Sequence, residues 1–178
     1  MGNVTIWKPA STAILSNYYL MKVLQEAGVP DGVINFVPGD GATISEVVFS
    51  SPDFAGVHFT GSTRTFNGFW KQICSNIDNY KTYPKIVGET GGKDFIFAHK
   101  SANPLQLAVA LVRGAFEYQG QKCSEASSAY IPNNIWEETL SHIKTMIPQI
   151  KMGSSMGLGN YMNSVIDEKS FDTISSYI

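Results

Sequence analysis

One of only two cysteines in this 178-residue chain stands in a setting suited to nucleophilic chemistry. Cys123 follows Gly-Gln-Lys and precedes a run of small residues, within FEYQGQKCSEASSAY at positions 116–130. A cysteine attacks as its thiolate, which nearby positive charge or backbone N–H groups stabilise, and small neighbours leave room for a substrate. Four roles are therefore open to Cys123: a packing residue, half of a disulfide, a metal ligand or a nucleophile.

The other cysteine and the histidines narrow these four roles to packing residue and nucleophile. Cys74 lies far from Cys123 and no close cluster of Cys and His is present, so neither a disulfide scaffold nor a metal site is expected. Cys74 itself, within FWKQICSNI, fits a packing residue of a helix. His58, His99 and His142 form no local pattern with Cys123, which disfavours a cysteine–histidine protease.

A single carboxylate is the second candidate for chemistry. Glu89 stands in GETGGK at 88–93, where a strand breaks into two glycines. A positioned carboxylate that is partly withdrawn from water can act as a general base. Taken alone, however, a glutamate that caps a turn is the commoner explanation.

The stretch FTGSTRT at 59–65 is a candidate anion site. A strand runs into Gly61 and Ser62, and a helix follows at once. The N–H groups at a helix N-terminus favour an anionic group, and glycine lets a phosphate approach closely. An ordinary strand-to-helix turn capped by Ser62 is the commoner explanation for this stretch alone, and no full GxGxxG motif is present.

Lys8, in WKPAS at 7–11, is the last candidate. It closes a strand at the sheet edge where α/β folds bind ligands, so its ammonium group could bond to ribose hydroxyls. A solvated lysine before a helix is again the commoner alternative.

The elements that must position these residues alternate between strand and helix. Strands are expected at 3–7, 33–39, 54–61 and 84–88, and helices at 11–27, 42–50 and 62–76. Ser11 or Thr12 is the expected N-cap of the first helix, and Gly28 its stop. Further strands at 95–99 and 127–131 and helices at about 104–118 and 134–147 continue the pattern. Such alternation is typical of an α/β fold with a parallel sheet covered by helices.

Composition excludes several classes of partner. The net charge of −2 disfavours nucleic acid or an anionic membrane as the main partner. No run approaches the roughly 20 apolar residues of a membrane span, and no targeting peptide is visible. The sequence opens almost directly on a strand and stops within an apparently amphipathic helix, SFDTISSYI. We therefore expect an internal piece of a larger fold whose apolar faces are exposed.

The four candidate sites occur together in one order, and this combination resembles the aldehyde dehydrogenase superfamily. The matching stretches are KPA at 8–10, FTGST at 59–63, ETGGK at 89–93 and GQKCS at 120–124. The stretches FTGSTRTFNGFWKQI, FEYQGQKCS, GNVTIWKPA and VIDEKSF resemble in particular the Δ1-pyrroline-5-carboxylate dehydrogenase branch. The resemblance covers the whole chain but only a middle piece of the family's subunit.

This resemblance implies a role for each matching residue. Cys123 matches the nucleophile that attacks an aldehyde, and Glu89 the base that activates water. The residues that match NAD contacts are Lys8 at the adenosine ribose, Gly61, Ser62, Thr63, Arg64 and Thr65 at the pyrophosphate, and Gly91 and Gly92 near the nicotinamide. The resemblance further implies part of a Rossmann-like NAD-binding domain at 1–88 and the start of an α/β catalytic domain at 89–178.

The same resemblance implies the reaction, the cofactor and the cellular setting. The expected activity is NAD-dependent oxidation of glutamate γ-semialdehyde in proline catabolism, with homo-oligomeric relatives and a location in the mitochondrial matrix. Two departures weigh against activity. Glu125 and Ser128 replace residues that the branch usually has after the cysteine. If the Glu125 carboxylate points inward, its negative charge would disfavour the Cys123 thiolate. The family's oxyanion asparagine also lies outside this sequence, so a catalytically inert fragment is the alternative.

Overall fold

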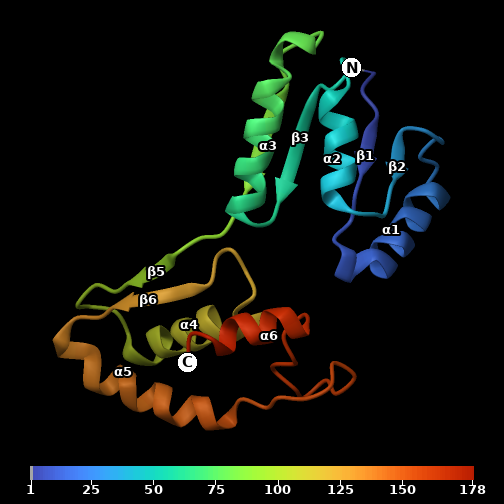
Figure 1. Cartoon of the computed structure of the whole chain (residues 1–178). Coiled ribbons are helices and arrows are strands. Elements are labelled where there is room, and N and C mark those ends of the chain that lie inside the picture. Colours follow the sequence, from blue (N-terminus) through green and yellow to red (C-terminus); the bar gives the residue numbers. More distant parts are fainter. Residues whose placement is uncertain (1) are drawn as a thin grey trace. The chain divides into compact units, whose positions relative to one another are not determined.

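The chain forms two compact units, which are described here separately. The computed structural model describes residues 2–178, and the units comprise residues 1–90 and 91–178 (Figure 1). Every strand pair in both units is parallel. Parallel pairing with intervening helices is the α/β arrangement that the alternation of elements predicts.

The first unit contains four strands and three α-helices. In chain order they are β1 (Thr5–Trp7), α1 (Ile14–Glu26), β2 (Ile34–Phe36), α2 (Gly41–Ser50), β3 (Gly56–Thr60), α3 (Thr63–Ser75) and β4 (Lys85–Glu89). Strand β1 pairs with β2, and β3 pairs with β4 in a register that aligns Thr60 with Glu89. The hydrogen-bonded unit is thus two strand pairs rather than one continuous sheet.

Aromatic packing between α2, α3 and the following loops makes the core of the first unit. Phe49, Phe54 and Ile73 are buried, and the Phe49 ring meets the Phe54 and Phe69 rings edge-on at centroid distances of 5.0 and 4.9 Å. Tyr80 closes this cluster and donates its hydroxyl proton to the Phe49 carbonyl at 2.6 Å. The core therefore fixes α3, and with it the turn that precedes the helix.

The second unit combines α-helices with one strand pair. Its elements are β5 (Asp94–Phe97), α4 (Pro104–Phe116), β6 (Ala126–Tyr130), α5 (Asn133–Met146) and α6 (Glu168–Ser175) (Figure 1). Ala98, Leu107 and Ile135 form its buried cluster. Thr139 is fully buried on α5, where its hydroxyl donates to the Ile135 carbonyl at 2.7 Å.

The ends of the elements agree with the sequence patterns where a local cap sets them. Gly28 ends α1 with a φ of +92°, and its N–H donates to the Gln25 carbonyl, as expected for a helix stop. The expectation that Ser11 or Thr12 caps the first helix is wrong. Residues 11–13 form a short 3₁₀ turn, and α1 begins after Ala13 without a side-chain cap.

Large apolar side chains are exposed on both units, as expected for a partial fold. On β5 and β6, Phe95, Phe97 and Tyr130 are 61%, 76% and 56% exposed, and the Tyr130 ring contacts both phenylalanine rings. On the first unit, Leu15, Val23 and Val47 are exposed. Within residues 2–178, none of the helices is long and apolar enough to cross a bilayer.

Candidate active site

The turn between β3 and α3 brings two of the predicted motifs together. The Gly61 N–H donates to the Glu89 carbonyl at 3.0 Å, which joins the end of β3 to the end of β4. The carboxyl ends of these parallel strands therefore place the glycine-serine turn directly beside the backbone of Glu89. Glu89 itself is exposed at this edge.

Ser62 caps α3, as the plainer interpretation of this stretch predicts. Its hydroxyl oxygen accepts the Thr65 N–H at 3.1 Å and lies 2.9 Å from the Thr65 hydroxyl. The first-turn N–H groups of Thr63 and Arg64 have no carbonyl to bond within the helix. With no acidic residue in this turn and the Arg64 side chain exposed, the helix end has positive potential. This arrangement suits an anionic group such as a phosphate.

Two glycines near this turn lie directly against an aromatic stack. The Phe59 and Phe66 rings are parallel, with an interplanar angle of 2° and centroids 6.0 Å apart. A Cβ atom at Gly88 would lie 2.2 Å from the Phe66 ring, and one at Gly61 would lie 2.5 Å from the Phe59 ring. The Phe59 ring thus covers the backbone at Gly61, in the turn after β3, and the Phe66 ring covers the backbone at Gly88, next to Glu89.

Lys8 lies at the end of β1 and reaches toward the start of α2. The half-buried Lys8 donates from Nζ to the Pro9 carbonyl at 2.5 Å, and its Cε would lie 3.6 Å from a Cβ at Gly41. Asp40 caps α2, and hydrogen bonds from the Thr43 N–H and hydroxyl lower the pKa of its carboxyl, with a smaller contribution from the Lys8 charge. Sequence reasoning missed Asp40, although an aspartate three residues before Thr43 is a standard capping signal.

In the second unit, Cys123 lies in an exposed turn between α4 and β6. Gly92 packs against it, because a Cβ atom on Gly92 would lie 2.5 Å from the Cys123 carbonyl oxygen. A Cβ atom on Gly91 would meet nothing within 4 Å. The second glycine of ETGGK therefore allows the close approach of the cysteine backbone, whereas the first faces open space.

Charged groups around Cys123 differ from the simplest expectation. The Lys122 ammonium next to Cys123 lies 3.4 Å from the Glu117 carboxylate, and this carboxylate also lies 3.6 Å from the Arg113 guanidinium. The positive charge of Lys122 is therefore partly balanced by Glu117. Glu125 is half-buried, and its Oε1 is enclosed with no hydrogen-bond partner among residues 2–178. That carboxylate oxygen is therefore withdrawn from solvent.

Two glutamines next to Cys123 were not singled out by sequence. Gln119 donates to the Ser164 carbonyl and accepts the Asn163 N–H, and Gln121 accepts the Ile166 N–H, so both bond to backbone about 45 positions later in the chain. No local pattern reveals such a contact, since the partners are backbone groups of a distant loop. Glu89 and Cys123 belong to the first and second unit respectively.

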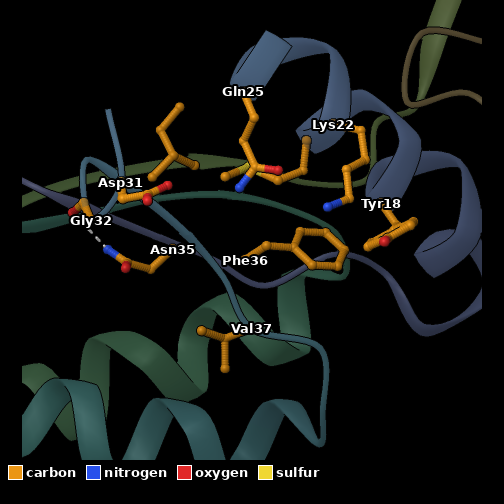
Figure 2. A pocket seen from close by; sticks show the side chains of 10 residues that line it. Tyr18, Lys22, Gln25, Asp31, Gly32, Asn35, Phe36 and Val37 are labelled. Carbon is orange, nitrogen blue, oxygen red and sulfur yellow. Dashed lines mark hydrogen bonds between the residues drawn. The ribbon is translucent and has the colours of Figure 1, made fainter. Parts of the chain in front are cut away.

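A pocket in the first unit contains none of the predicted residues. Figure 2 shows it between α1 and the segment around β2, with Tyr18, Lys22 and Gln25 on the helix side. The Lys22 ammonium lies 5.3 Å from the centre of the Tyr18 ring, and the Asn35 amide donates to the Gly32 carbonyl at 3.0 Å. Among residues 2–178, no group of three or more His, Cys, Asp or Glu side chains is placed to hold a metal ion.

Comparison with known proteins gives a family match over the whole chain. The model of the aldehyde dehydrogenase family matches residues 1–178. The Delta-1-pyrroline-5-carboxylate dehydrogenases of Dictyostelium discoideum, Agaricus bisporus and Homo sapiens are 50%, 49% and 41% identical to it over its full length. The chain spans about a third of each relative, at 32%, 33% and 32% of their lengths.

Solved structures give the same result. The crystal structure of the Delta-pyrroline-5-carboxylate dehydrogenase from Mycobacterium tuberculosis matches 99% of this chain with a TM-score of 0.94 and 46% identity, and 33% of that protein is covered. The same protein bound with NAD matches equally well. The corresponding enzyme from Thermus with bound NAD matches with a TM-score of 0.90 at 27% identity.

Proposed function

The chain belongs to the aldehyde dehydrogenase family, and we propose that it supplies the nucleophile, the base and part of the NAD site for oxidation of L-glutamate γ-semialdehyde to L-glutamate. The observation that carries this proposal is the Gly61–Glu89 hydrogen bond, which joins a helix N-terminus suited to phosphate to the proposed base. Relatives that match the full chain are named Delta-1-pyrroline-5-carboxylate dehydrogenases, which supports this proposal.

The proposed chemistry begins at Cys123. Its thiolate adds to the aldehyde carbon, and the carbonyl oxygen takes the negative charge of a thiohemiacetal. The Cys123 N–H is suited to donate to that oxygen. Collapse of this adduct expels a hydride and leaves a thioester on the sulfur. NAD, when bound, accepts the hydride.

Glu89 completes the proposed cycle by hydrolysis. Its carboxylate takes a proton from a water molecule as the water oxygen attacks the thioester carbon. The carbon–sulfur bond breaks, the product leaves as a carboxylate and the cysteine thiolate is restored. One aldehyde, one NAD⁺ and one water thus give one carboxylate, one NADH and two protons.

The residues of the first unit fit the cofactor's anionic part. Gly61, Ser62, Thr63, Arg64 and Thr65 form the helix start that we assign to the pyrophosphate, and Lys8 is assigned to the adenosine ribose. The absence of acidic residues in the first turn of α3 supports this assignment. Gly91 is assigned to the nicotinamide end. Gly92 is assigned to the nicotinamide end as well, and its close approach to the Cys123 carbonyl supports a role in positioning the backbone of the nucleophile.

We further propose the domain division and the cellular location of the chain from its relatives. Residues 1–88 are proposed as part of the NAD-binding domain and 89–178 as the start of the catalytic domain. Several relatives carry the word mitochondrial in their names, which supports a mitochondrial matrix location in proline catabolism. Homo-oligomerisation of the full-length protein is part of the same proposal.

NADH formation tests the proposal directly. The purified 178-residue chain is mixed with NAD and glutamate semialdehyde, and NADH is followed by absorbance. We expect turnover that is lost in Cys123→Ser and kept in Cys74→Ser, because Cys74 lies on α3 outside the proposed site. Folded protein that forms no NADH would overturn the proposal for this chain and favour the catalytically inert fragment.

A further inference from the structure

The turn that leads into Cys123 has an unusual backbone. Tyr118, Gln119 and Gly120 follow one another with φ values of 55°, 59° and 68°. Left-handed backbone is disfavoured for residues with a Cβ atom, and two such residues in succession are rare. Surrounding contacts must therefore hold this conformation in place.

The Gln119 side chain provides one such contact with both ends of its amide. Its Nε2 donates to the Ser164 carbonyl at 3.0 Å, and its Oε1 accepts the Asn163 N–H at 3.1 Å. The half-buried amide thus pairs with two successive residues of the backbone, much as a neighbouring strand would. Because both of its polar atoms are engaged, the pairing fixes the direction of the side chain.

Gln121 provides a second contact two residues later. Its Oε1 accepts the Ile166 N–H at 2.9 Å, and its Nε2 donates back to the Tyr118 carbonyl at 3.2 Å. This glutamine therefore bonds to the distant segment and to the left-handed turn at the same time. Together the two side chains bridge residues 118–121 and residues 163–166.

The segment that receives these bonds is itself anchored. It runs directly into α6, whose start is capped by Asp167, with Oδ1 accepting the Ser170 N–H at 2.8 Å (Figure 1). On its other side, the Met162 N–H donates to the Lys151 carbonyl at 3.2 Å. Residues 163–166 thus offer a fixed row of backbone groups to the two glutamines.

We propose that Gln119 and Gln121 are positioning residues that hold the left-handed turn, and so present Cys123 in a single geometry. This inference rests on the proposed role of Cys123 as nucleophile. Gln121 lies two residues before Cys123, and Gly92 supports the cysteine carbonyl from another segment. A nucleophile needs its attack direction and its nearby N–H donors fixed in advance, and the bridge supplies that order.

Amide hydrogen exchange in the intact chain tests whether the bridge exists in solution. Gln119→Ala removes the partner of the Asn163 N–H, and Gln121→Ala removes that of the Ile166 N–H. We expect exchange at each of these amides, and at residues 118–124, to rise about tenfold in the corresponding variant. The matched control is Gln149→Ala, whose side chain bonds only locally to the Thr145 carbonyl and is exposed. Unchanged exchange in folded Gln119→Ala and Gln121→Ala would overturn the bridge.

Thiol alkylation tests whether the bridge acts on Cys123. The rate of iodoacetamide labelling at Cys123 is compared with that at Cys74 in the same molecule by mass spectrometry at pH 7. We expect the ratio of the two rates to fall about tenfold in both bridge variants, because a loosened turn no longer holds N–H groups beside the thiolate. A ratio unchanged within twofold, with the turn shown to be loosened, would overturn the positioning role.

These measurements are separate from the test of enzymatic activity, since neither needs NAD or aldehyde. Gln119→Glu refines the result, because it keeps an acceptor for the Asn163 N–H but loses the donor to the Ser164 carbonyl. Its exchange rate is expected to lie between those of the native chain and Gln119→Ala. An exchange rate as high as that of Gln119→Ala would contradict the two-ended pairing.

Discussion

The two units hold their proposed catalytic residues by different means. In residues 1–90, the Gly61–Ser62 turn and Glu89 are fixed by a cap within one helix turn and by pairing of neighbouring parallel strands. In residues 91–178, Gly92 lies against the Cys123 carbonyl from 31 positions earlier. Gln119 and Gln121, which precede Cys123, bond to backbone groups 44 and 45 positions after themselves. The proposed base is thus held by regular secondary structure, and the proposed nucleophile lies among contacts between irregular segments.

This difference indicates where each unit is sensitive to change. A helix cap contributes one replaceable hydrogen bond, whereas a close backbone contact leaves no room for even one added methyl group. An added Cβ at Gly92 beside the Cys123 backbone should therefore cost more stability than loss of the Ser62 cap at the α3 turn.

Gly92→Ala is expected to have the largest effect. Its added Cβ would lie 2.5 Å from the Cys123 carbonyl, and relieving this overlap requires a backbone shift. We expect a loss of about 2 kcal/mol in the free energy of unfolding, measured by urea denaturation. Gly91→Ala is the matched control, because its Cβ would enter open space. Equal losses in the two variants would remove the special status of the cysteine turn.

Glu125→Ala is expected to stabilise the second unit. It removes a carboxylate oxygen that is enclosed without a hydrogen-bond partner among residues 2–178. We expect a gain of about 1 kcal/mol in thermal or urea unfolding. Glu137→Ala on the exposed surface of α5 should change stability by less than about 0.5 kcal/mol. A destabilised Glu125→Ala would show that this carboxylate does have a stabilising partner.

Ser62→Ala is expected to cost about 1 kcal/mol, because the Thr65 N–H loses its acceptor. The same change at Ser75, in the last turn of α3, is the control, since its hydroxyl donates to the Gln72 carbonyl and caps no free N–H group. The helical signal at 222 nm during urea unfolding reports both. A Ser62→Ala loss larger than that of Gly92→Ala would reverse the proposed contrast between the units.

Acidification should weaken both units through their aspartate caps. Hydrogen bonds from Thr43 lower the pKa of Asp40, and hydrogen bonds from Ser170 lower the pKa of Asp167. A carboxyl whose pKa is lower when folded contributes stability above its unfolded pKa of about 3.9, and this contribution is lost as pH falls below that value.

Circular dichroism between pH 6 and pH 2 measures this loss. Because the two aspartates cap α2 and α6, one in each unit, the effect should be small and similar in both. Asp40→Asn and Asp167→Asn keep a capping oxygen but cannot ionise, so each should flatten the pH dependence of its own helix. A steeper dependence in either variant would contradict the assignment.

Sequence reasoning succeeded where local chemistry sets the structure. The alternation of elements gave the α/β class, Gly28 gave the end of α1, and Ser62 gave the start of α3. It failed at the start of α1, where no side chain caps the helix, and it merged strand pairs that are separate here.

For the site, residue types and spacing made Glu89 and Cys123 candidates, and the family resemblance implied their roles, which stay predictions. The contacts of Gln119 and Gln121, and that of Gly92 with Cys123, were not accessible from sequence, because their partners are backbone atoms 31 to 45 residues away. Such partners are fixed by tertiary packing and leave no periodic or compositional signal in the sequence.

Glu89→Gln shows whether Cys123 and Glu89 act in succession on one substrate, as proposed. The variant is incubated with NAD and glutamate semialdehyde, and the peptide that contains Cys123 is weighed by mass spectrometry. We predict one NADH per chain and a glutamyl thioester that accumulates on Cys123, because attack and hydride loss proceed without the base. An unmodified Cys123, or NADH formation that continues at the native rate, would contradict the account.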